Sequence, residues 1–166
     1  MNMKLESSPY KVVEALKSDK KDIMRFYKSQ QYSARFIGKD HCYIVKLNNK
    51  IVASVILSAG QVCGDYWLLH GLVIDKVMRG KKIASVILQA IINSEHLGSK
   101  FKKIICFADV ALQGLYIKNL FVTYNSTAEI KTLPQELRQR LNRYQSKQPN
   151  LHCYLYSNHS GITSQN

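Results

Sequence analysis

The sequence predicts a mixed α/β (α+β) fold, in which a mostly antiparallel twisted sheet is flanked by helices and contains one β-α-β unit. Two β-rich segments, 42–47 and 50–57, are joined by a pair of asparagines, which tolerate the positive φ angles of a tight hairpin. The segment 66–74 is apolar almost throughout, which is typical of a central strand covered on both faces. A basic turn, a helical apolar pattern and a further strand over 103–108 follow it and complete the β-α-β unit.

The other segments are assigned from the spacing of their apolar residues. Gly71 interrupts the central strand, which indicates a β-bulge or a close backbone approach. In mixed sheets ligands bind where a strand ends and a helix begins, so we expect the ligand site at the turn that contains Arg79. Besides the hairpin and the central strand, we expect a strand over 10–16, helices beginning near 18–22 and spanning 83–94, 110–119 and 133–148, and a last strand over 151–156.

Length and composition predict one packed domain over residues 1–157, followed by a polar, mobile tail over 158–166. Hydrophobic residues make up 46% of the chain and charged residues 21%, which excludes a disordered or fibrous protein. Residues 1–11 carry charges without an apolar run, and nowhere is an apolar stretch long enough to cross a bilayer. We therefore expect a cytoplasmic location and no membrane partner.

The four cysteines, Cys42, Cys63, Cys106 and Cys153, are widely spaced along the chain. No C-x-x-C pair and no cluster of histidines accompanies them, so the sequence indicates neither a zinc site nor a disulfide framework. We expect reduced, mostly buried thiols and no metal. Cys106 lies in an apolar run, where a thiol behaves as a small hydrophobic side chain rather than as a nucleophile.

The turn over 79–84 has the sequence Arg-Gly-Lys-Lys-Ile-Ala and joins the central strand to a helix. A turn of this kind directs backbone N–H groups and the positive end of the helix dipole at one point, which suits a pyrophosphate. Together with Leu72-Val-Ile-Asp75, it resembles the central motif of the GNAT acetyltransferases, Arg/Gln-x-x-Gly-x-Gly/Ala. Arg79 matches the first position of that motif and Ala84 the last, whereas Lys82 stands where the family has Gly.

The resemblance implies that acetyl-CoA is the cosubstrate and that its pyrophosphate lies at this turn. Lys82 would either crowd the phosphates or turn outward and reinforce their binding. Asp109 stands where the family often has Asn seven residues before a key tyrosine, and an anion is less suited to lie beside CoA. The implied cofactor-binding residues are Leu72, Val73, Ile74, Arg79, Gly80, Lys81, Lys82, Ile83, Ala84, Ser85 and Asp109.

A second motif follows about 30 residues further on, where Leu115-Tyr-Ile-Lys-Asn-Leu-Phe121 is similar to the family's Leu-Tyr-x-Lys-x-Gly-Phe helix, with Leu120 in place of Gly. The resemblance implies that Tyr116 protonates the departing CoA thiolate, a role that suits a phenol with an ordinary pKa of about 10. The alternative is that Tyr116 is a core residue, since it shares a helical face with leucines.

His70 is similar in position to the glutamate that serves as the general base in many family members. A histidine, with an ordinary pKa near 6.5, would take a proton from the acceptor ammonium directly or through water. The alternative is a histidine that is hydrogen-bonded within the sheet. The residues whose chemistry suits an acceptor pocket are Tyr32, Arg35 and Phe36, and surface packing explains them equally well.

The resemblance predicts an N-acetyltransferase that passes an acetyl group from acetyl-CoA to an amine by direct attack. The alternative from another class is a non-catalytic CoA-binding regulatory protein with the same fold. The chain also carries 24 Lys and Arg against 11 Asp and Glu, a formal net charge of +13. This charge favours anions, so CoA, nucleic acid or an acidic protein are open partners, and a homodimer through an exposed strand edge is a further open possibility.

Overall fold

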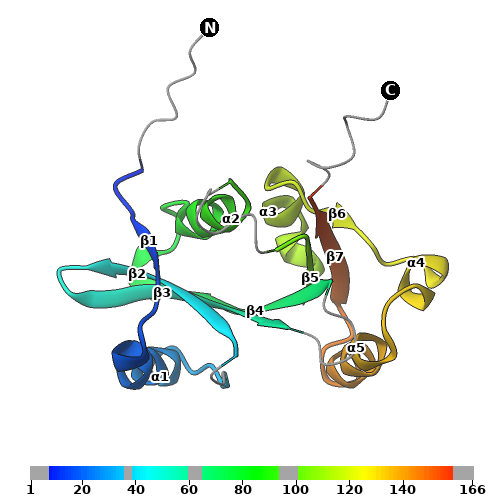
Figure 1. Cartoon of the computed structure of the whole chain (residues 1–166), viewed down its shortest axis with the longest axis horizontal. Helices are drawn as coiled ribbons and strands as arrows, with labels where there is room; N and C mark the ends of the chain where they lie inside the picture. The colour runs from blue at the N-terminus through cyan, green and yellow to red at the C-terminus, as the bar shows by residue number, and fades with distance from the viewer. Residues whose placement is uncertain (1–7, 36–38, 60–64, 94–100, 159–166) are drawn as a thin grey trace, which may run out of the picture.

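A seven-stranded sheet with the strand order β1-β2-β3-β4-β5-β7-β6 organises the chain (Figure 1). In this computed structural model, residues 8–35, 39–59, 65–93 and 101–158 are described. β4 and β5 are parallel, and the other five pairings are antiparallel, which confirms the predicted fold class. The strands are β1 (Val12–Glu14), β2 (His41–Leu47), β3 (Lys50–Ala59), β4 (Tyr66–Ile74), β5 (Lys103–Asp109), β6 (Val122–Thr123) and β7 (Leu151–Ser157).

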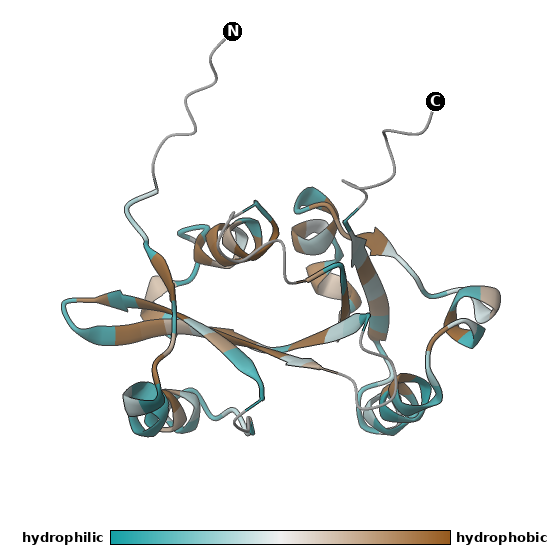
Figure 2. Cartoon of the chain, in the orientation of Figure 1, coloured by the Kyte–Doolittle hydropathy of each residue, from teal (hydrophilic) through white to brown (hydrophobic). Residues whose placement is uncertain are grey.

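Helices cover both faces of this sheet. α1 and α5 pack on one face, and α2 and α3 pack on the other (Figure 1). α2 is apolar along most of its length, whereas α1 and α5 bury only a stripe and are hydrophilic elsewhere (Figure 2). The helices are α1 (Lys20–Ser29), α2 (Ile83–Asn93), α3 (Gln113–Lys118), α4 (Thr127–Lys131) and α5 (Gln135–Lys147), with short 3₁₀ turns at Lys17–Asp19, Lys76–Met78 and Val110–Leu112.

The predicted hairpin between β2 and β3 is confirmed. Asn48 and Asn49 form its turn with φ angles of 50° and 63°, in the left-handed region that a two-residue hairpin loop requires. The central strand also has the predicted bounds and is covered on both faces. Leu69 packs in the cluster that includes α2, whereas Leu68 packs with α5.

A β-bulge interrupts β4, as Gly71 predicts. The register places Ser54 of β3 opposite Val73 and Ile56 opposite His70, so two residues of β4, Gly71 and Leu72, lie opposite a single residue of β3. Gly71 has a φ angle of 62°, which favours glycine. The bulge redirects the last residues of β4.

Two hydrogen bonds from one buried tyrosine hold the bulge in place. The hydroxyl of Tyr27, on α1, is 2.7 Å from the carbonyl oxygen of Gly71, to which it donates, and 3.0 Å from Oγ of Ser54. Tyr27 and Ser54 are fully buried. Burial raises the pKa of Tyr27 far above its ordinary value, so the hydroxyl stays a donor at any physiological pH.

β4 and β5 separate beyond the bulge. Their pairing runs from Tyr66 to Leu69 on β4 and from Lys103 to Cys106 on β5. β4 then continues beside β3 alone, while β5 continues beside β7 as far as Asp109. The sheet therefore opens in its centre, at the carboxyl ends of its two parallel strands.

The chain differs from the predicted elements in several places, among them β6, a short strand that the sequence does not predict, and β1, which is shorter than the strand expected over 10–16. The segment predicted as one helix over 110–119 begins as a 3₁₀ turn, because Oδ1 of Asp109 accepts a hydrogen bond from the N–H of Ala111 at 2.9 Å and tightens the first turn. α4 is a short helix that apolar spacing does not reveal. It is stabilised by a capping box in which the side chains of Ser126 and Glu129 bond each other's backbone N–H groups.

Cys42, Cys106 and Cys153 are buried free thiols, as the sequence predicts, whereas Cys63 lies outside the described residues. Of the predicted tail only Asn158 is described, and its N–H donates to the carbonyl of Lys102 at 2.7 Å. Within the described residues, none of the helices combines the length and the apolar character that a membrane crossing needs.

Replacing Gly71 by Ala is expected to lower the free energy of unfolding by about 1–2 kcal/mol, because an L-residue at this positive φ is strained. The added Cβ would also lie 3.1 Å from the hydroxyl oxygen of Tyr27. Gly114→Ala in α3 is the matched control, since its Cβ meets no described atom within 4 Å and alanine favours a helix. Urea denaturation measures the free energy of unfolding of both variants. If Gly71→Ala were as stable as Gly114→Ala, the role given to the bulge would be contradicted.

Candidate functional site

The loop between β4 and α2 aims backbone N–H groups at a single point. Asp75 shapes its beginning, because Oδ1 accepts a hydrogen bond from the N–H of Val77 at 3.1 Å. The first hydrogen bond of α2 runs from the N–H of Val86 to the carbonyl of Lys82, at 3.1 Å. The N–H groups over 83–85 therefore lie outside the helix's own hydrogen-bond pattern and are available to an anion.

A cavity of about 650 Å³ lies against this turn and reaches the opening between β4 and β5. It brings together most of the predicted cofactor-binding residues with Tyr116. Lys81 and Asp109 do not line it: Lys81 is exposed in the same turn, and the carboxylate of Asp109 caps the 3₁₀ turn after β5. The predicted residues that line the cavity are Leu72, Val73, Ile74, Arg79, Gly80, Lys82, Ile83, Ala84, Ser85 and Tyr116.

Three cationic side chains, Arg79, Lys82 and Lys118, line the cavity, and no Asp or Glu is among its described lining residues. The cavity therefore has a positive potential, to which the N-terminal end of α2 adds its own partial charge. This electrostatic environment is suited to a polyanionic ligand.

Lys82 and Leu120 stand where the family motifs have glycine. The backbone at both positions nevertheless keeps the positive φ angle that favours glycine. Lys82 has a φ angle of 63° and Leu120 one of 73°. Both side chains are exposed, and Leu120 is 65% accessible to solvent. Each is strained by about 1–2 kcal/mol relative to glycine, and the geometry of the two turns is retained despite the substitutions.

Tyr116, on α3, is 2% exposed and lies between two aromatic rings, stacked on Tyr154 and edge-on to Phe121, each with a centroid distance of 5.3 Å. The pKa of Tyr116 is raised well above its ordinary value, chiefly by burial and then by Cys106. The phenol is therefore protonated at neutral pH, as a proton donor must be.

Asn119 connects α3 to the first turn of α2, a role that the sequence did not reveal. Its side-chain nitrogen donates to Oγ of Ser85 at 3.1 Å and to the carbonyl of Leu115 at 2.8 Å. Asn119 is 2% exposed. Because Ser85 lines the cavity, this bridge fixes the position of the cavity wall.

His70 is half-buried on β4, with Nε2 2.8 Å from Oγ of Ser58. The pKa of His70 is lowered, chiefly by burial, with Arg140 acting in the same direction and Asp40 against it. The imidazole is therefore neutral at pH 7. Its β3 partner, Ile56, packs with α1, so His70 lies on the sheet face that carries α1 and α5.

His70 and Tyr116 therefore lie on opposite faces of the sheet, and His70 does not line the described cavity. The cavity nevertheless extends toward both faces, because its walls include Tyr32, which follows α1, as well as Tyr116 of α3. The pKa of Tyr32 is raised chiefly by burial, and the backbone of Gly71, at the point where the strands separate, acts in the opposite direction. The opening between β4 and β5 is the place where groups from the two faces can approach one another.

Sequence reasoning missed several cavity residues. Gln30 follows α1, and its Oε1 accepts a hydrogen bond from the N–H of Lys76 at 3.2 Å, so it ties α1 to the turn. No sequence signal distinguishes it. Of the residues whose chemistry suits an acceptor pocket, Tyr32 lines this cavity, Arg35 is exposed and does not line it, and Phe36 lies outside the described residues. The further lining residues are Met78, Leu112, Gly114, Leu115 and Lys118.

Comparison with known proteins agrees with this architecture. The family pattern described as "Acetyltransferase (GNAT) family" matches residues 6–121, well over half of the chain. The chain belongs to the GNAT acetyltransferase family. The match covers both motifs, the β4–α2 turn and the helix that carries Tyr116. A comparison with curated protein sequences finds no match.

Solved structures share the GNAT fold at low sequence identity. N-acetylglutamate synthase from Neisseria gonorrhoeae, complexed with coenzyme A and N-acetylglutamate, is 15% identical with a TM-score of 0.65, over 92% of this chain and 36% of that one. This chain thus spans about a third of that enzyme. A GNAT family acetyltransferase from Staphylococcus aureus Mu50 is 16% identical with a TM-score of 0.60, over 89% and 98% of the two chains. Diaminobutyrate acetyltransferase from Paenibacillus lautus, in complex with L-2,4-diaminobutyric acid and coenzyme A, is 12% identical with a TM-score of 0.57, over 89% and 95%.

Lys82→Gly is expected to raise the free energy of unfolding by about 1 kcal/mol, because glycine adopts the positive φ at this position without strain. Lys81 is not among the residues with a positive φ, so glycine relieves no strain there. Lys81→Gly is therefore expected to lower the free energy of unfolding by up to about 1 kcal/mol, because glycine makes the unfolded chain more flexible. Both variants lose one positive charge, so their difference reports the backbone conformation. Chemical denaturation measures it, and destabilisation by Lys82→Gly as large as that by Lys81→Gly would contradict the argument.

Proposed function

We propose that the protein is an acetyl-CoA-dependent N-acetyltransferase that passes an acetyl group to the amine of an acceptor. The observation that carries the proposal is the single cavity that joins the N-terminal turn of α2 to the buried Tyr116 and to the opening between β4 and β5. An anion site, a proton donor and an unpaired strand edge therefore meet in one place, within a fold whose family transfers acetyl groups.

The residues present fit an acyl-CoA. Arg79, Lys82 and the N–H groups over 83–85 would hold the pyrophosphate at the positive end of α2. The backbone of Leu72 and Ile74, on the part of β4 that has left β5, would bind the pantetheine amides as a neighbouring strand would. When bound, acetyl-CoA supplies the activated thioester.

Tyr116 is proposed as the general acid. Its raised pKa keeps the phenol protonated, and the proton would pass to the sulfur that leaves the acetyl group. Burial raises the pKa of Cys106, which interacts with Tyr116, to about 12. The cysteine therefore stays neutral and would not take the proton itself.

His70 is proposed as the general base, acting on the other face of the sheet. The neutral imidazole, hydrogen-bonded to Ser58, would remove a proton from the acceptor ammonium, directly or through one water molecule. The position of His70 outside the cavity walls favours the relay through water. An amine that reaches the opening from this face would attack the thioester carbonyl directly, and no covalent enzyme intermediate is required.

A second candidate is a CoA-binding protein without catalysis. The observation that favours it is the interaction of Tyr116 with Cys106, together with side chains in place of glycine at Lys82 and Leu120. This candidate predicts acetyl-CoA binding without turnover, so one experiment separates it from the enzyme.

Titration calorimetry is expected to detect acetyl-CoA binding, and a panel of primary amines is then expected to include one that drives thiol release. Tyr116→Phe should reduce that release by about 100-fold or more and leave acetyl-CoA binding unchanged, because only the proton donor is lost. Tyr154→Phe is the control: its ring stacks on Tyr116, and its buried hydroxyl has no hydrogen-bond partner in the described structure. Binding without release would support the second candidate, and the absence of binding would overturn both.

His70→Gln is expected to lower turnover and to remove an acidic limb from the pH profile. The pKa of His70 lies below its ordinary 6.5, so wild-type activity should be full above that value and fall as the imidazole becomes protonated. His152→Gln on β7 is the matched control and should keep this limb. An unchanged pH profile in His70→Gln would contradict the role of the histidine as base and leave it a structural residue.

A further inference from the structure

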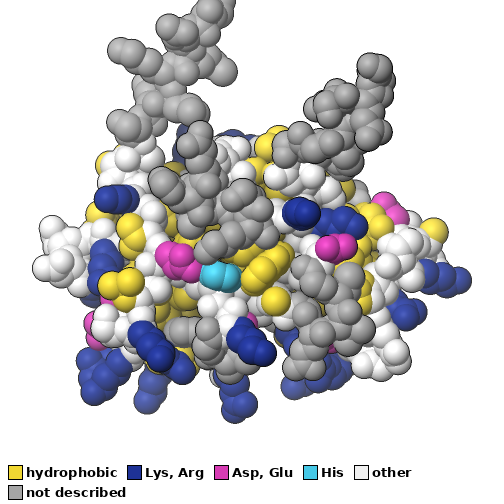
Figure 3. All heavy atoms as spheres, in the orientation of Figure 1, with side chains coloured by type: hydrophobic (Ala, Val, Ile, Leu, Met, Phe, Trp, Pro, Cys, Tyr) yellow, Lys and Arg dark blue, Asp and Glu magenta, His cyan; other side chains and the backbone are white. Residues whose placement is uncertain are grey.

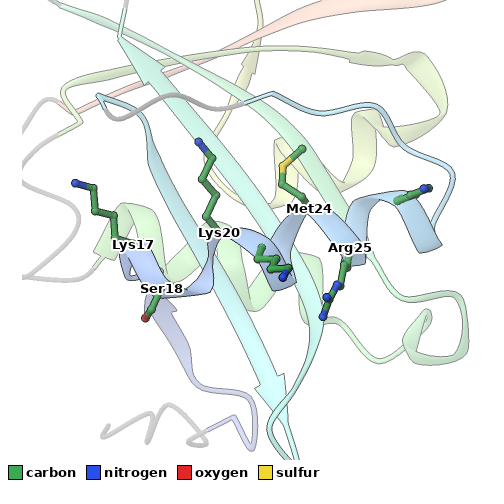
Figure 4. Close-up of a pocket in the computed structure, with 7 residues that line it drawn as sticks. Lys17, Ser18, Lys20, Met24 and Arg25 are labelled. Atoms are coloured by element: carbon green, nitrogen blue, oxygen red, sulfur yellow. The ribbon is translucent and has the colours of Figure 1, made fainter.

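The solvent side of α1 and of the turn before it gathers positive charge away from the cofactor cavity. An open concavity of about 640 Å³ is lined there by Lys17, Ser18, Lys20, Lys21, Met24, Arg25 and Lys28, none of which lines the cavity beside α2. Figure 4 shows Lys17, Lys20 and Met24 extending from one side of the helix, with Arg25 on another. We call these seven residues the α1 basic surface.

The acidic residues near this surface neutralise only part of its charge. Asp22 lies 3.7 Å from the guanidinium of Arg25, and both side chains are more than 60% exposed, so this pair is weak. Asp19 is engaged elsewhere, because it accepts from Nζ of Lys46 at 3.0 Å and from the N–H of Leu16 at 2.8 Å. All five cations are exposed, and Asp22 is the only carboxylate within α1.

The cations form a row rather than a point. Lys17, Lys21 and Lys28 are separated by one and then two helical turns, so the row extends for roughly 16 Å along the helix. α5 lies on the same face of the sheet, and Lys and Arg side chains continue along that edge of the molecule over both helices (Figure 3). Arg143 and Lys147 are exposed on α5. An extended polyanion matches this surface better than a small anion does.

The α1 basic surface has little apolar content. The apolar stripe of α1, Ile23, Phe26 and Tyr27, is buried against the sheet, so the helix has no face to insert into a lipid layer. Met24, 37% exposed, is the one apolar side chain among the seven lining residues. Of the residue types that dominate protein–protein interfaces, Trp, Tyr and Arg, this surface has only Arg25. It also offers no aromatic ring on which single-stranded bases would stack.

We propose that the α1 basic surface binds the phosphate backbone of a nucleic-acid duplex, without reading its base sequence. Lysine and arginine bind phosphates by releasing the counterions condensed along the duplex, and this mode of binding needs charge, reach and exposure but no apolar anchor. The five cations supply these properties along the exposed side of α1 and the turn before it. This activity goes beyond acetyl transfer and does not depend on it.

The test measures binding of the full chain to a fluorescein-labelled 20-base-pair DNA duplex. Fluorescence anisotropy of the duplex is recorded at a series of salt concentrations, without acetyl-CoA. Lys21→Glu/Lys28→Glu is the test variant. Lys102→Glu/Lys131→Glu is the matched control, because it removes the same charge from exposed positions outside α1. Circular dichroism melting establishes that both variants are folded.

We expect the wild-type chain to bind the duplex with an affinity that falls steeply with salt. The α1 variant should bind at least about tenfold more weakly, with the slope of log K against log salt reduced by about 2, because two phosphate contacts are lost. The control should stay within about threefold of wild type. Equal losses in the two variants would overturn the proposal by assigning the binding to net charge, and so would tighter binding to polyglutamate or to phosphatidylserine vesicles than to the duplex.

Discussion

The hydrogen bond from the Tyr27 hydroxyl to the Gly71 carbonyl is the constraint on which the rest of the structure depends. It fixes the bulge in β4, and the bulge sends the end of β4 away from β5. That separation leaves a strand edge unpaired at the centre of the sheet, where the cavity forms. Tyr32, which follows α1, lines the same cavity, so residues in and just after α1 support the centre of the site from the opposite face.

At the two motif positions where this chain lacks the family's glycine, the backbone still adopts the conformation that glycine favours. Lys82 and Leu120 both keep a positive φ; both side chains are exposed, and that of Lys82 lines the cavity. The strain is held by packing around each turn. Asn119, which precedes Leu120, is buried and bonded to Ser85 in the first turn of α2, so the two turns support one another across the cavity wall.

Positive charge is divided between two surfaces with different geometry. In the cavity, Arg79, Lys82 and Lys118 surround a concave site that includes a helix N-terminus, which suits the compact pyrophosphate of one ligand. On α1 the cations form an exposed row along the helix, which suits a repeating polyanion. The net charge of +13 alone could not separate these two uses, because it does not depend on where the charges lie.

The sequence by itself determined the fold class, the hairpin turn at Asn48 and Asn49, the bounds of β4 and the position of the turn between β4 and α2, because these follow from local spacing and local φ preferences. Tertiary structure alone decided which residues meet. It placed Gln30 and Tyr32 in the cavity wall and separated His70 from Tyr116 across the sheet. It also turned Asp109 into a cap rather than a cavity residue. These outcomes depend on contacts between segments far apart in the chain, which no local pattern encodes.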